Sequence, residues 1–233
     1  METVFVSLAG YIIKINSNNN LKNRFNKYLT EKKEVDFCVT ANRQHFRVAK
    51  GFMPGEPEEE IEFAAILCAI HEELLKRGAA TIHAAAVEVD GRAYAFSGES
   101  GVGKSTQVAL LKQLLKGRLA VINGDKPIIT FEGEKAYVSG SPWCGKEGES
   151  ENKTVPLCSF CFLERAEAPE IRKLSDGEVI ERLFRQFSVP ADKELMQSAL
   201  SIADKLIKST DFYLLKCTND IKCAELAFKE MSK

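Results

Sequence analysis

Hydrophobic residues recur along the chain with two periods, and each period predicts one kind of secondary structure. Alternating apolar and polar positions indicate strands, whereas apolar positions three or four residues apart indicate helices. In the first 53 residues, the alternating pattern predicts short strands at 4–8, 11–15, 35–40 and 45–49. Between the second and third of these, Leu21, Phe25 and Tyr28 share one face of a predicted short helix.

After a turn rich in proline and glycine at 54–57, strands alternate with helices, which is typical of an α/β domain. The first helix begins with three glutamates from Glu58, where the positive end of a helix favours anions. His71 is expected on the surface of this helix. The remaining helices are predicted at 104–116, 176–187, 191–208 and 220–231, and the remaining strands at 81–88, 92–97, 118–123, 155–165 and 212–217, with a hairpin over 128–139. We therefore expect a small β-rich N-terminal segment, 1–56, packed on a main domain formed by 57–233.

The composition is that of an ordinary globular domain, and it narrows the range of partners. Hydrophobic residues make up 45% of the chain and charged residues 28%, and 32 basic residues nearly balance 33 acidic ones. A formal net charge of −1 gives no electrostatic reason to expect nucleic acid or an anionic membrane surface. No apolar run approaches the roughly 20 residues that span a bilayer, and the N-terminus alternates like a strand instead of resembling a signal peptide. We expect a cytoplasmic protein that binds neither nucleic acid nor membranes, and a homo-oligomer stays open as an alternative to a monomer.

The seven cysteines are an odd number and are scattered, which is typical of reduced thiols. Cys158 and Cys161 form a Cys-x-x-Cys pair within a predicted strand, where a spacing of three sends their side chains to opposite faces. Because no second pair or nearby histidine accompanies them, no zinc or redox site is expected.

A glycine-rich segment between a predicted strand and a predicted helix fits the Walker A pattern of phosphate-binding loops. Its spacing is Gly-x-x-x-x-Gly-Lys-Ser, and its glycines let backbone N–H groups turn toward phosphate oxygens. The following helix adds its positive end. Lys104 is expected to reach the β- and γ-phosphates, and the Ser105 hydroxyl is expected to bind Mg²⁺. The predicted nucleotide-binding residues are Gly98, Glu99, Ser100, Gly101, Val102, Gly103, Lys104, Ser105 and Thr106.

An acidic residue follows the next predicted strand, as in a Walker B segment. Asp125 is the natural second ligand of Mg²⁺ in that arrangement, and a solvated turn aspartate is the alternative. The Asn-Lys-x-Asp tetrad that reads guanine is missing from the sequence, so ATP is preferred to GTP.

The strand that leads into the glycine-rich segment follows an antiparallel partner instead of a helical crossover. Asp90-Gly91 separates the two strands and suits a two-residue hairpin turn, because both central positions need a positive φ. The start of the first strand then pairs with the end of the second. His83 is therefore expected near Ser97 and Gly98, beside the bound phosphates, and a structural core histidine is the alternative.

The stretch "IHAAAVEVDGRAYAFSGESGVGKST", followed after about twenty residues by "GDK", resembles the HPr kinase/phosphorylase family and the related ATP-dependent phosphoenolpyruvate carboxykinases. The resemblance covers roughly 80–129. It extends loosely through "SPWCGKEG" and "VPLCSFCFLER", which are similar to uncharacterised HPr-kinase-like proteins more than to HPr kinase itself. It implies a P-loop α/β domain whose mixed sheet has an antiparallel hairpin before the loop. Gly124 stands where that family has the first of two aspartates, which leaves Asp125 alone to bind metal or act as a base.

Three further residues are candidates for contacts to the acceptor or to the transferred phosphate. Trp143 and Lys146 lie in a long polar loop between predicted strands, where binding residues often occur. Packing against the core is the alternative for Trp143, and a solvated charge is the alternative for Lys146. Arg165, at the end of its predicted strand, is a candidate for stabilising charge on the phosphoryl group.

Together these patterns predict an ATP- and Mg²⁺-dependent kinase that transfers the γ-phosphate to a hydroxyl, with a serine of a protein or peptide as the favoured acceptor. Lys104 would neutralise phosphate charge, while Asp125, with His83 nearby, would accept or orient the hydroxyl proton. Two alternatives stay open. One is a kinase for a small alcohol metabolite, and the other is a catalytically weak nucleotide-binding regulatory or scaffold protein.

Overall fold

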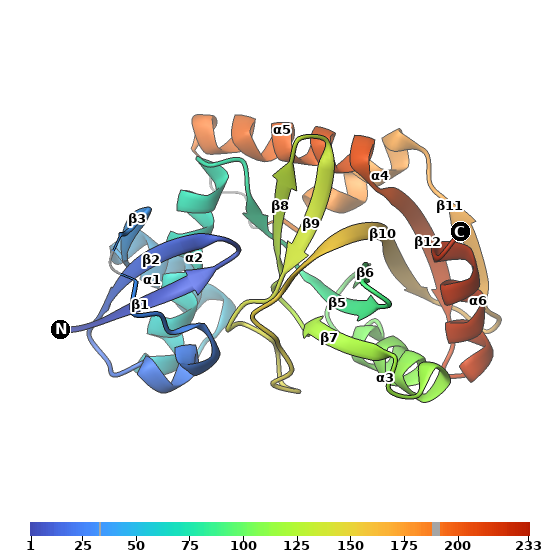
Figure 1. The fold of residues 1–233 in the computed structure, drawn as a ribbon, viewed down its shortest axis with the longest axis horizontal. Coiled ribbons are helices and arrows are strands. Elements are labelled where there is room, and N and C mark those ends of the chain that lie inside the picture. The colour runs from blue at the N-terminus through green and yellow to red at the C-terminus, as the bar shows by residue number, and fades with distance from the viewer. Residues whose placement is uncertain (33, 188–191) are drawn as a thin grey trace.

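The computed structural model describes residues 1–32, 34–187 and 192–233, whose strands form a three-stranded sheet and a nine-stranded sheet (Figure 1). The small sheet lies in the N-terminal part of the chain, and β2 pairs antiparallel with β1 and parallel with β3. The elements of this part are β1 (Glu2–Leu8), β2 (Tyr11–Ser17), the 3-10 helix η1 (Lys22–Tyr28), β3 (Phe37–Thr40) and α1 (Arg43–Phe52). The predicted short helix is confirmed by η1, which buries Phe25 and Tyr28.

The strand predicted at 45–49 is wrong, because these residues lie inside α1. Asn42 precedes the helix, and its side chain accepts hydrogen bonds from the backbone N–H groups of Gln44 and His45. Such a cap satisfies N–H groups that have no partner at the start of a helix. The local alternation of apolar and polar residues is too short to outweigh this cap and the burial of Ala49.

The nine-stranded sheet and the helices around it make up the rest of the described chain. In order, the elements are α2 (Glu58–Leu75), β4 (Ala80–Thr81), β5 (Ala84–Val89), β6 (Arg92–Ser97), α3 (Lys104–Leu115), β7 (Leu119–Asn123), β8 (Ile128–Glu132), β9 (Lys135–Ser139), β10 (Thr154–Arg165), β11 (Glu170–Lys173), α4 (Asp176–Phe184), α5 (Lys193–Ser209), β12 (Asp211–Cys217) and α6 (Ile221–Met231). The expected mixed α/β architecture is therefore present. β11 has no counterpart in the sequence-based prediction, and the single strand predicted at 81–88 is instead two strands, β4, which pairs with β8, and β5, which pairs with β6. Residue 191 of the helix predicted at 191–208 lies outside the described residues.

The predicted hairpin before the glycine-rich segment is confirmed. β5 and β6 pair antiparallel from Ala84–Ser97 to Val89–Arg92, and the turn residues Asp90 and Gly91 have φ of 50° and 80°. β7 pairs antiparallel with β5, whereas β10 pairs parallel with both β6 and β12. The carboxyl ends of β6, β7, β10 and β12 therefore meet at one edge of the sheet, together with the start of β5.

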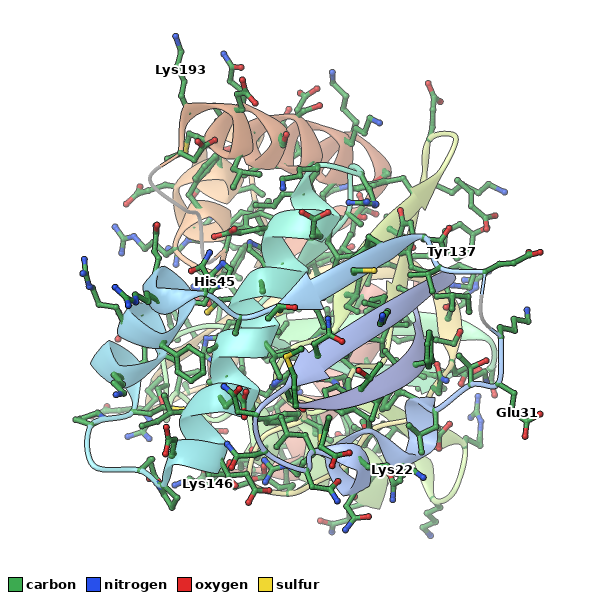
Figure 2. The ribbon with its side chains drawn as sticks, turned by 90° about the vertical axis from the view of Figure 1, so that its left-hand side faces the viewer. Lys22, Glu31, His45, Tyr137, Lys146 and Lys193 are labelled. Carbon is green, nitrogen blue, oxygen red and sulfur yellow. The ribbon has the colours of Figure 1, made fainter. Side chains whose placement is uncertain are left out.

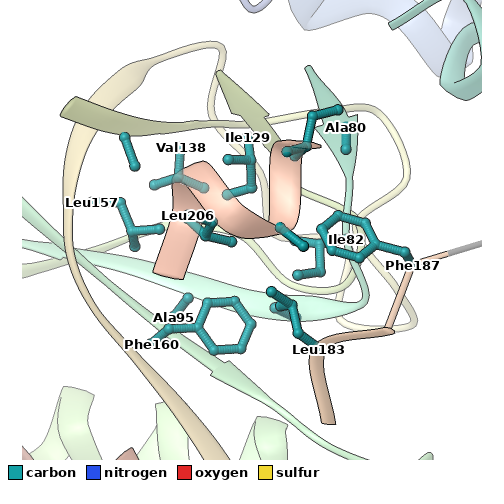
Figure 3. Packing of buried hydrophobic residues seen from close by; sticks show 14 of the residues in the cluster. Ala80, Ile82, Ala95, Ile129, Val138, Leu157, Phe160, Leu183, Phe187 and Leu206 are labelled. Atoms are coloured by element: carbon teal, nitrogen blue, oxygen red, sulfur yellow. The ribbon is translucent and has the colours of Figure 1, made fainter. Parts of the chain in front are cut away.

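Helices cover both faces of the large sheet, with α4 and α5 on one side and α3 and α6 on the other (Figure 1). Figure 3 shows the first of these cores, where Ile82, Ala95 and Phe160 from the sheet side meet Leu183 of α4 and Leu206 of α5. Small alanines line β5 and β6 on this face, which lets the helices approach the strands closely.

Two side chains lie elsewhere than the sequence predicts. A β-bulge interrupts the register of β10 between Leu157 and Ser159, so Cys158 packs against the same hydrophobic cluster as Cys161 and not on the opposite face. His71 is 2% exposed and not a surface residue, because its Nδ1 lies 2.7 Å from the Thr81 hydroxyl. Both differences arise from contacts that a single periodic pattern does not contain.

The N-terminal sheet shares a hydrophobic core with α2 and with residues much later in the chain. Ile66 and Ile70 of α2 lie in one cluster with Phe25, Ile128 and Trp143. The division between 1–56 and 57–233 thus stays a prediction, since one continuous core crosses it. Within the described residues, no helix combines the length and apolarity needed to cross a membrane.

We predict that Gly140→Ala lowers the free energy of unfolding by at least about 2 kcal/mol, because overpacking of a filled core typically costs 1–3 kcal/mol. A Cβ at Gly140 would lie 1.8 Å from the Glu151 carbonyl oxygen and 2.7 Å from that of Ile122. Thermal denaturation followed by circular dichroism measures the effect. Gly177→Ala is the control, since nothing lies within 4 Å of a Cβ there, and equal melting temperatures for the two variants would refute the close backbone contact.

Candidate functional site

The carboxyl edge of the large sheet brings together the three residues predicted to act on a phosphoryl group. His83 directly precedes β5, Asp125 follows β7 by two residues, and Lys104 is the first residue of α3 after β6. The backbone ties these positions together, since Ala84 N donates to the Asp125 carbonyl oxygen at 3.0 Å. The Ser97 hydroxyl donates to the His83 carbonyl oxygen at 2.6 Å. The expected closeness of His83 to the end of β6 is thus observed.

The glycine-rich loop, residues 98–103, curls around the Lys104 ammonium. Gly98, Gly101 and Gly103 have φ of 145°, 77° and 125°, a region that side chains with a Cβ rarely adopt. At Gly98 a Cβ would also lie 3.0 Å from the Leu163 carbonyl oxygen. The Lys104 Nζ donates to the Gly98 carbonyl oxygen at 3.0 Å and to that of Glu99 at 3.2 Å. Burial lowers the pKa of Lys104, while the negative charge of Asp125 acts against this shift.

The remaining loop residues present polar groups to solvent at the start of α3. Ser105 and Thr106 are exposed in the first helical turn, as are Glu99 and Ser100 before it. Because the first N–H groups of a helix have no helical partner, this turn can donate hydrogen bonds to anionic oxygens. The geometry therefore agrees with what a phosphate-binding loop requires, and nucleotide contacts by these residues stay predictions.

His83 and Asp125 form the central pair of the site. His83 Nε2 lies 3.2 Å from Asp125 Oδ1, and the two side chains are 25% and 32% exposed. Burial alone would raise the pKa of Asp125, but the hydrogen bond from His83 and the charges of Lys126, His83 and Lys104 outweigh it and lower that pKa. Asp125 is consequently a carboxylate at neutral pH, within a half-buried setting that excludes part of the solvent.

The turn that presents Asp125 is built by a residue that the sequence analysis did not single out. Asn123 is fully buried, and its Oδ1 accepts the backbone N–H groups of Asp125 at 2.8 Å and of Lys126 at 2.7 Å. Its Nδ2 donates to the Ser141 carbonyl oxygen at 2.9 Å. Asparagine side chains commonly bond to the backbone two residues on, so Asn-Gly-Asp after an apolar strand was the available signal.

Gly124 has a structural reason to lack a side chain. A Cβ at this position would lie 2.4 Å from the Cys144 carbonyl oxygen, and Gly124 N donates to the Glu149 carbonyl oxygen at 3.1 Å. The loop between β9 and β10 therefore occupies the space where a second carboxylate would stand. Gly145 of the same loop, in turn, lies against Asp125.

Lys126 is a second charged residue of the site that the sequence analysis did not assign. Burial lowers the pKa of its ammonium group, against the opposing effect of the Asp125 charge. Among the described residues, no carboxylate oxygen lies within 4 Å of the Lys126 Nζ. A largely buried cation without an ion-pair partner favours binding of an anionic group beside Asp125.

The three candidate substrate residues occupy different surroundings. Trp143 is 7% exposed, donates from Nε1 to the Phe63 carbonyl oxygen at 3.0 Å and stacks on the Phe63 ring at 4.9 Å. Trp143 therefore packs against the core, as the alternative interpretation expects, and it also lines a cavity. Lys146 is exposed beside the same cavity. Arg165 is on the other side of the site, where it donates to the Gly101 carbonyl oxygen.

A basic hollow of about 710 Å³ opens beside the glycine-rich loop. Its wall includes Gly98–Val102 together with Arg165 and two arginines of the α4 region, Arg182 and Arg185. Arg182 pairs with Glu164, and Arg185 pairs with Glu181. Of the three, only Arg165 contacts the loop backbone, which makes it the arginine best placed to steady the loop.

Comparisons with known proteins find matches among solved structures. No family profile matches the sequence, and no curated protein matches it. Among solved structures, the chain is similar to the HPr(Ser) kinase/phosphatase from Coxiella burnetii, with 12% sequence identity and a TM-score of 0.37. This similarity covers 66% of this chain and 99% of that one. At this level the likeness carries no further argument.

We predict that His83→Ala raises the pKa of Asp125, because it removes a hydrogen bond to the carboxylate form. The carboxyl ¹³C shift of Asp125 followed over acidic pH measures this change. His45→Ala is the control, since His45 faces Glu72 at 3.1 Å instead. An unchanged midpoint in His83→Ala would contradict the pairing.

Since the pKa of Asp125 is lowered on folding from about 3.8, its pairing with His83 stabilises the fold above that value and ceases to do so as pH falls through the lowered pKa.

A second prediction concerns the missing carboxylate. Gly124→Asp should lower the free energy of unfolding by at least about 2 kcal/mol and shift the Trp143 emission, because the new side chain displaces the loop that carries this residue. Gly133→Asp is the matched control, as nothing lies within 4 Å of a Cβ in that turn and aspartate tolerates its positive φ. If Gly124→Asp keeps the stability and the Trp143 emission of the unmodified protein, the close backbone contact does not exclude a side chain at this position, and the prediction is wrong.

Proposed function

We propose that this protein is an ATP- and Mg²⁺-dependent kinase that transfers the γ-phosphate to an acceptor hydroxyl, with a serine of a protein or peptide as the acceptor. The observation that carries the proposal is the 3.2 Å contact between His83 and Asp125 at the sheet edge where the glycine-rich loop holds Lys104. In this proposal, the Asp125 carboxylate, the His83 imidazole and the glycine-rich loop act together in the phosphate transfer.

Phosphate binding is supported by the local conformation of the loop. Three glycines with positive φ turn the backbone around a cation, and the first turn of α3 directs free N–H groups toward the same space. On nucleotide binding, Lys104 exchanges its bonds to the Gly98 and Glu99 carbonyl oxygens for phosphate oxygens. Holding the phosphates in a fixed position supplies most of the rate in this class of reaction.

Asp125 is the proposed proton acceptor. Its lowered pKa keeps it ionised, and His83 fixes the orientation of the carboxylate. In the step, the acceptor oxygen forms a bond to the γ-phosphorus, the bond from that phosphorus to the β-phosphate oxygen breaks, and the hydroxyl proton passes to Asp125. ADP leaves with the released charge, which Lys104 and the loop N–H groups stabilise.

The residues present fit Mg²⁺ bound through a nucleotide. Magnesium in such sites takes one or two carboxylates together with phosphate oxygens and water, and Asp125 and Ser105 offer one carboxylate and one hydroxyl. Within the described residues, no cluster of three acidic, histidine or cysteine side chains forms a separate metal cage. When bound, the metal would neutralise charge on the β- and γ-phosphates.

A second candidate function is nucleotide binding with little or no transfer, as in a regulatory or scaffold protein. The observation that favours it is the backbone contact at Gly124, which leaves a single carboxylate for both the metal and the proton. A small alcohol metabolite as acceptor is a third possibility that the site chemistry permits. Transfer to an offered hydroxyl distinguishes these alternatives.

We predict that Lys104→Ala weakens Mg²⁺–ATP binding at least 10-fold, about 1.4 kcal/mol, and reduces phosphate transfer by 100-fold or more. The reason is the loss of the only ammonium held inside the glycine-rich loop among the described residues. Titration calorimetry measures the binding, and γ-labelled ATP with serine-containing peptides measures the transfer.

Lys116→Ala is the matched control for this experiment. Lys116 lies just beyond the opposite end of α3, is exposed, and has no contact with the loop. Its replacement should leave binding and transfer unchanged. If Lys104→Ala binds Mg²⁺–ATP like the unmodified protein, the proposed nucleotide site is wrong.

A further inference from the structure

A cavity of about 720 Å³ adjoins Asp125, and residues 98–103 of the glycine-rich loop are not part of its lining. It is enclosed by α1, α2 and the loop between β9 and β10, and Figure 2 views the molecule from this side, with His45 of α1 and Lys146 labelled. Ligand sites of proteins typically measure roughly 300–1,000 Å³ and are mainly apolar, with a few convergent polar groups. The lining of this cavity is likewise mainly apolar, with a few charged residues such as Asp125 and Lys126.

The apolar wall of the cavity contains two stacked aromatic rings. Phe63 stacks on Trp143 with an interplanar angle of 22°, and the Arg24 guanidinium lies 4.3 Å above the Phe63 ring. Arg24 is itself held by two hydrogen bonds to Glu60, at 2.5 and 2.9 Å. With the Trp143 nitrogen and the Arg24 charge already satisfied, this wall offers mainly hydrocarbon and ring surface to a ligand.

Two polar residues of the cavity belong to the proposed reaction centre. Asp125 and Lys126 are part of its lining, and the cavity therefore adjoins the residue whose carboxylate faces His83. Among the described residues, Lys126 has no carboxylate oxygen within 4 Å, so its ammonium can donate hydrogen bonds to an anionic oxygen of a ligand. A molecule in this cavity would have its polar end at Asp125 and its apolar part against Phe63.

The rim of the cavity carries exposed apolar side chains of α1, and the basic residues of this helix line a separate hollow. Phe52 is 80% exposed and Val48 is 40% exposed, and both lie on α1 at the rim. The helix they belong to carries Arg43, Arg47 and Lys50 but no acidic residue. A ligand confined to the cavity would not use this surface, whereas an extended chain that leaves the mouth would cross it.

Resting on the proposed kinase function, we infer that the cavity is the acceptor site, and that the acceptor is an acidic, amphipathic stretch of polypeptide. A bulky apolar side chain next to the phosphorylated serine fills the space against Phe63 and Trp143. The serine hydroxyl then lies at Asp125, and acidic residues beyond the mouth face α1. The N-terminal segment thereby contributes substrate recognition through the wall and rim that α1 provides.

The test uses degenerate serine peptides with γ-labelled ATP and the full-length chain. We expect at least 5-fold selection for leucine, phenylalanine or methionine close to the serine, and a weaker selection for acidic residues further away. Ala64→Phe, which fills the cavity, should reduce transfer to the selected peptides at least 10-fold with unchanged ATP affinity. Ala109→Phe, on the exposed face of α3, is the matched control. Phe52→Ala, at an 80% exposed position that folding does not depend on, should weaken the apolar selection as well.

A binding measurement separates this inference from the kinase proposal. Trp143 is the only tryptophan of the chain, so its fluorescence reports occupation of the cavity without ATP. An acidic peptide with leucine and phenylalanine beside its serine should change this emission, and its twin with alanines there should not. Failure of ATP binding with intact peptide binding would refute only the kinase function. Transfer without apolar selection, transfer to small alcohols alone, or equal effects of the two peptides on the emission would overturn the acceptor site.

Discussion

The antiparallel pairing of β5 with β6 is the constraint on which the rest of the site depends. Because the two strands are joined by a two-residue turn, the residue before β5 must lie beside the end of β6, and the Ser97 hydroxyl locks this arrangement by bonding to the His83 carbonyl oxygen. β7 on the far side of β5 then brings Asp125 to the imidazole of His83. With a helical crossover in place of the hairpin, the two strands would be parallel, and the residue before β5 would lie at the opposite edge of the sheet from the end of β6.

The loop between β9 and β10 sets the chemistry of that edge as much as the strands do. Its backbone approaches Gly124 so closely that a side chain there is excluded, and it lies against Asp125 through Gly145. This edge therefore has Asp125 but no side chain at position 124. The same loop lines the cavity beside Asp125, so that the exclusion of a side chain at position 124 and part of the cavity wall arise from one structural feature.

Much of the fold could be predicted from local signals, and the departures have physical causes. Asp90-Gly91 predicted the hairpin because the turn requires positive φ, and the glycine spacing predicted the loop around Lys104. The surroundings of Gly124 and Trp143 were not predictable, since both depend on backbone from a distant loop. The helix at 43–52 was mistaken for a strand because the Asn42 cap outweighs a short alternating pattern. The cavity is formed by α1, α2 and the loop between β9 and β10, and hydrophobic periodicity does not predict contacts between such distant segments.

The shared core of the N-terminal sheet also bears on how the chain acquires its structure during synthesis. Strands β1 to β3 are synthesised before α2, Ile128 and Trp143, yet these later residues complete their hydrophobic cluster. Domains generally begin to fold as they leave the ribosome, at about 5–20 residues per second. At this rate the segment around Trp143 is synthesised several seconds after β3. During that interval, the apolar surface that Trp143 covers in the folded protein lacks this partner.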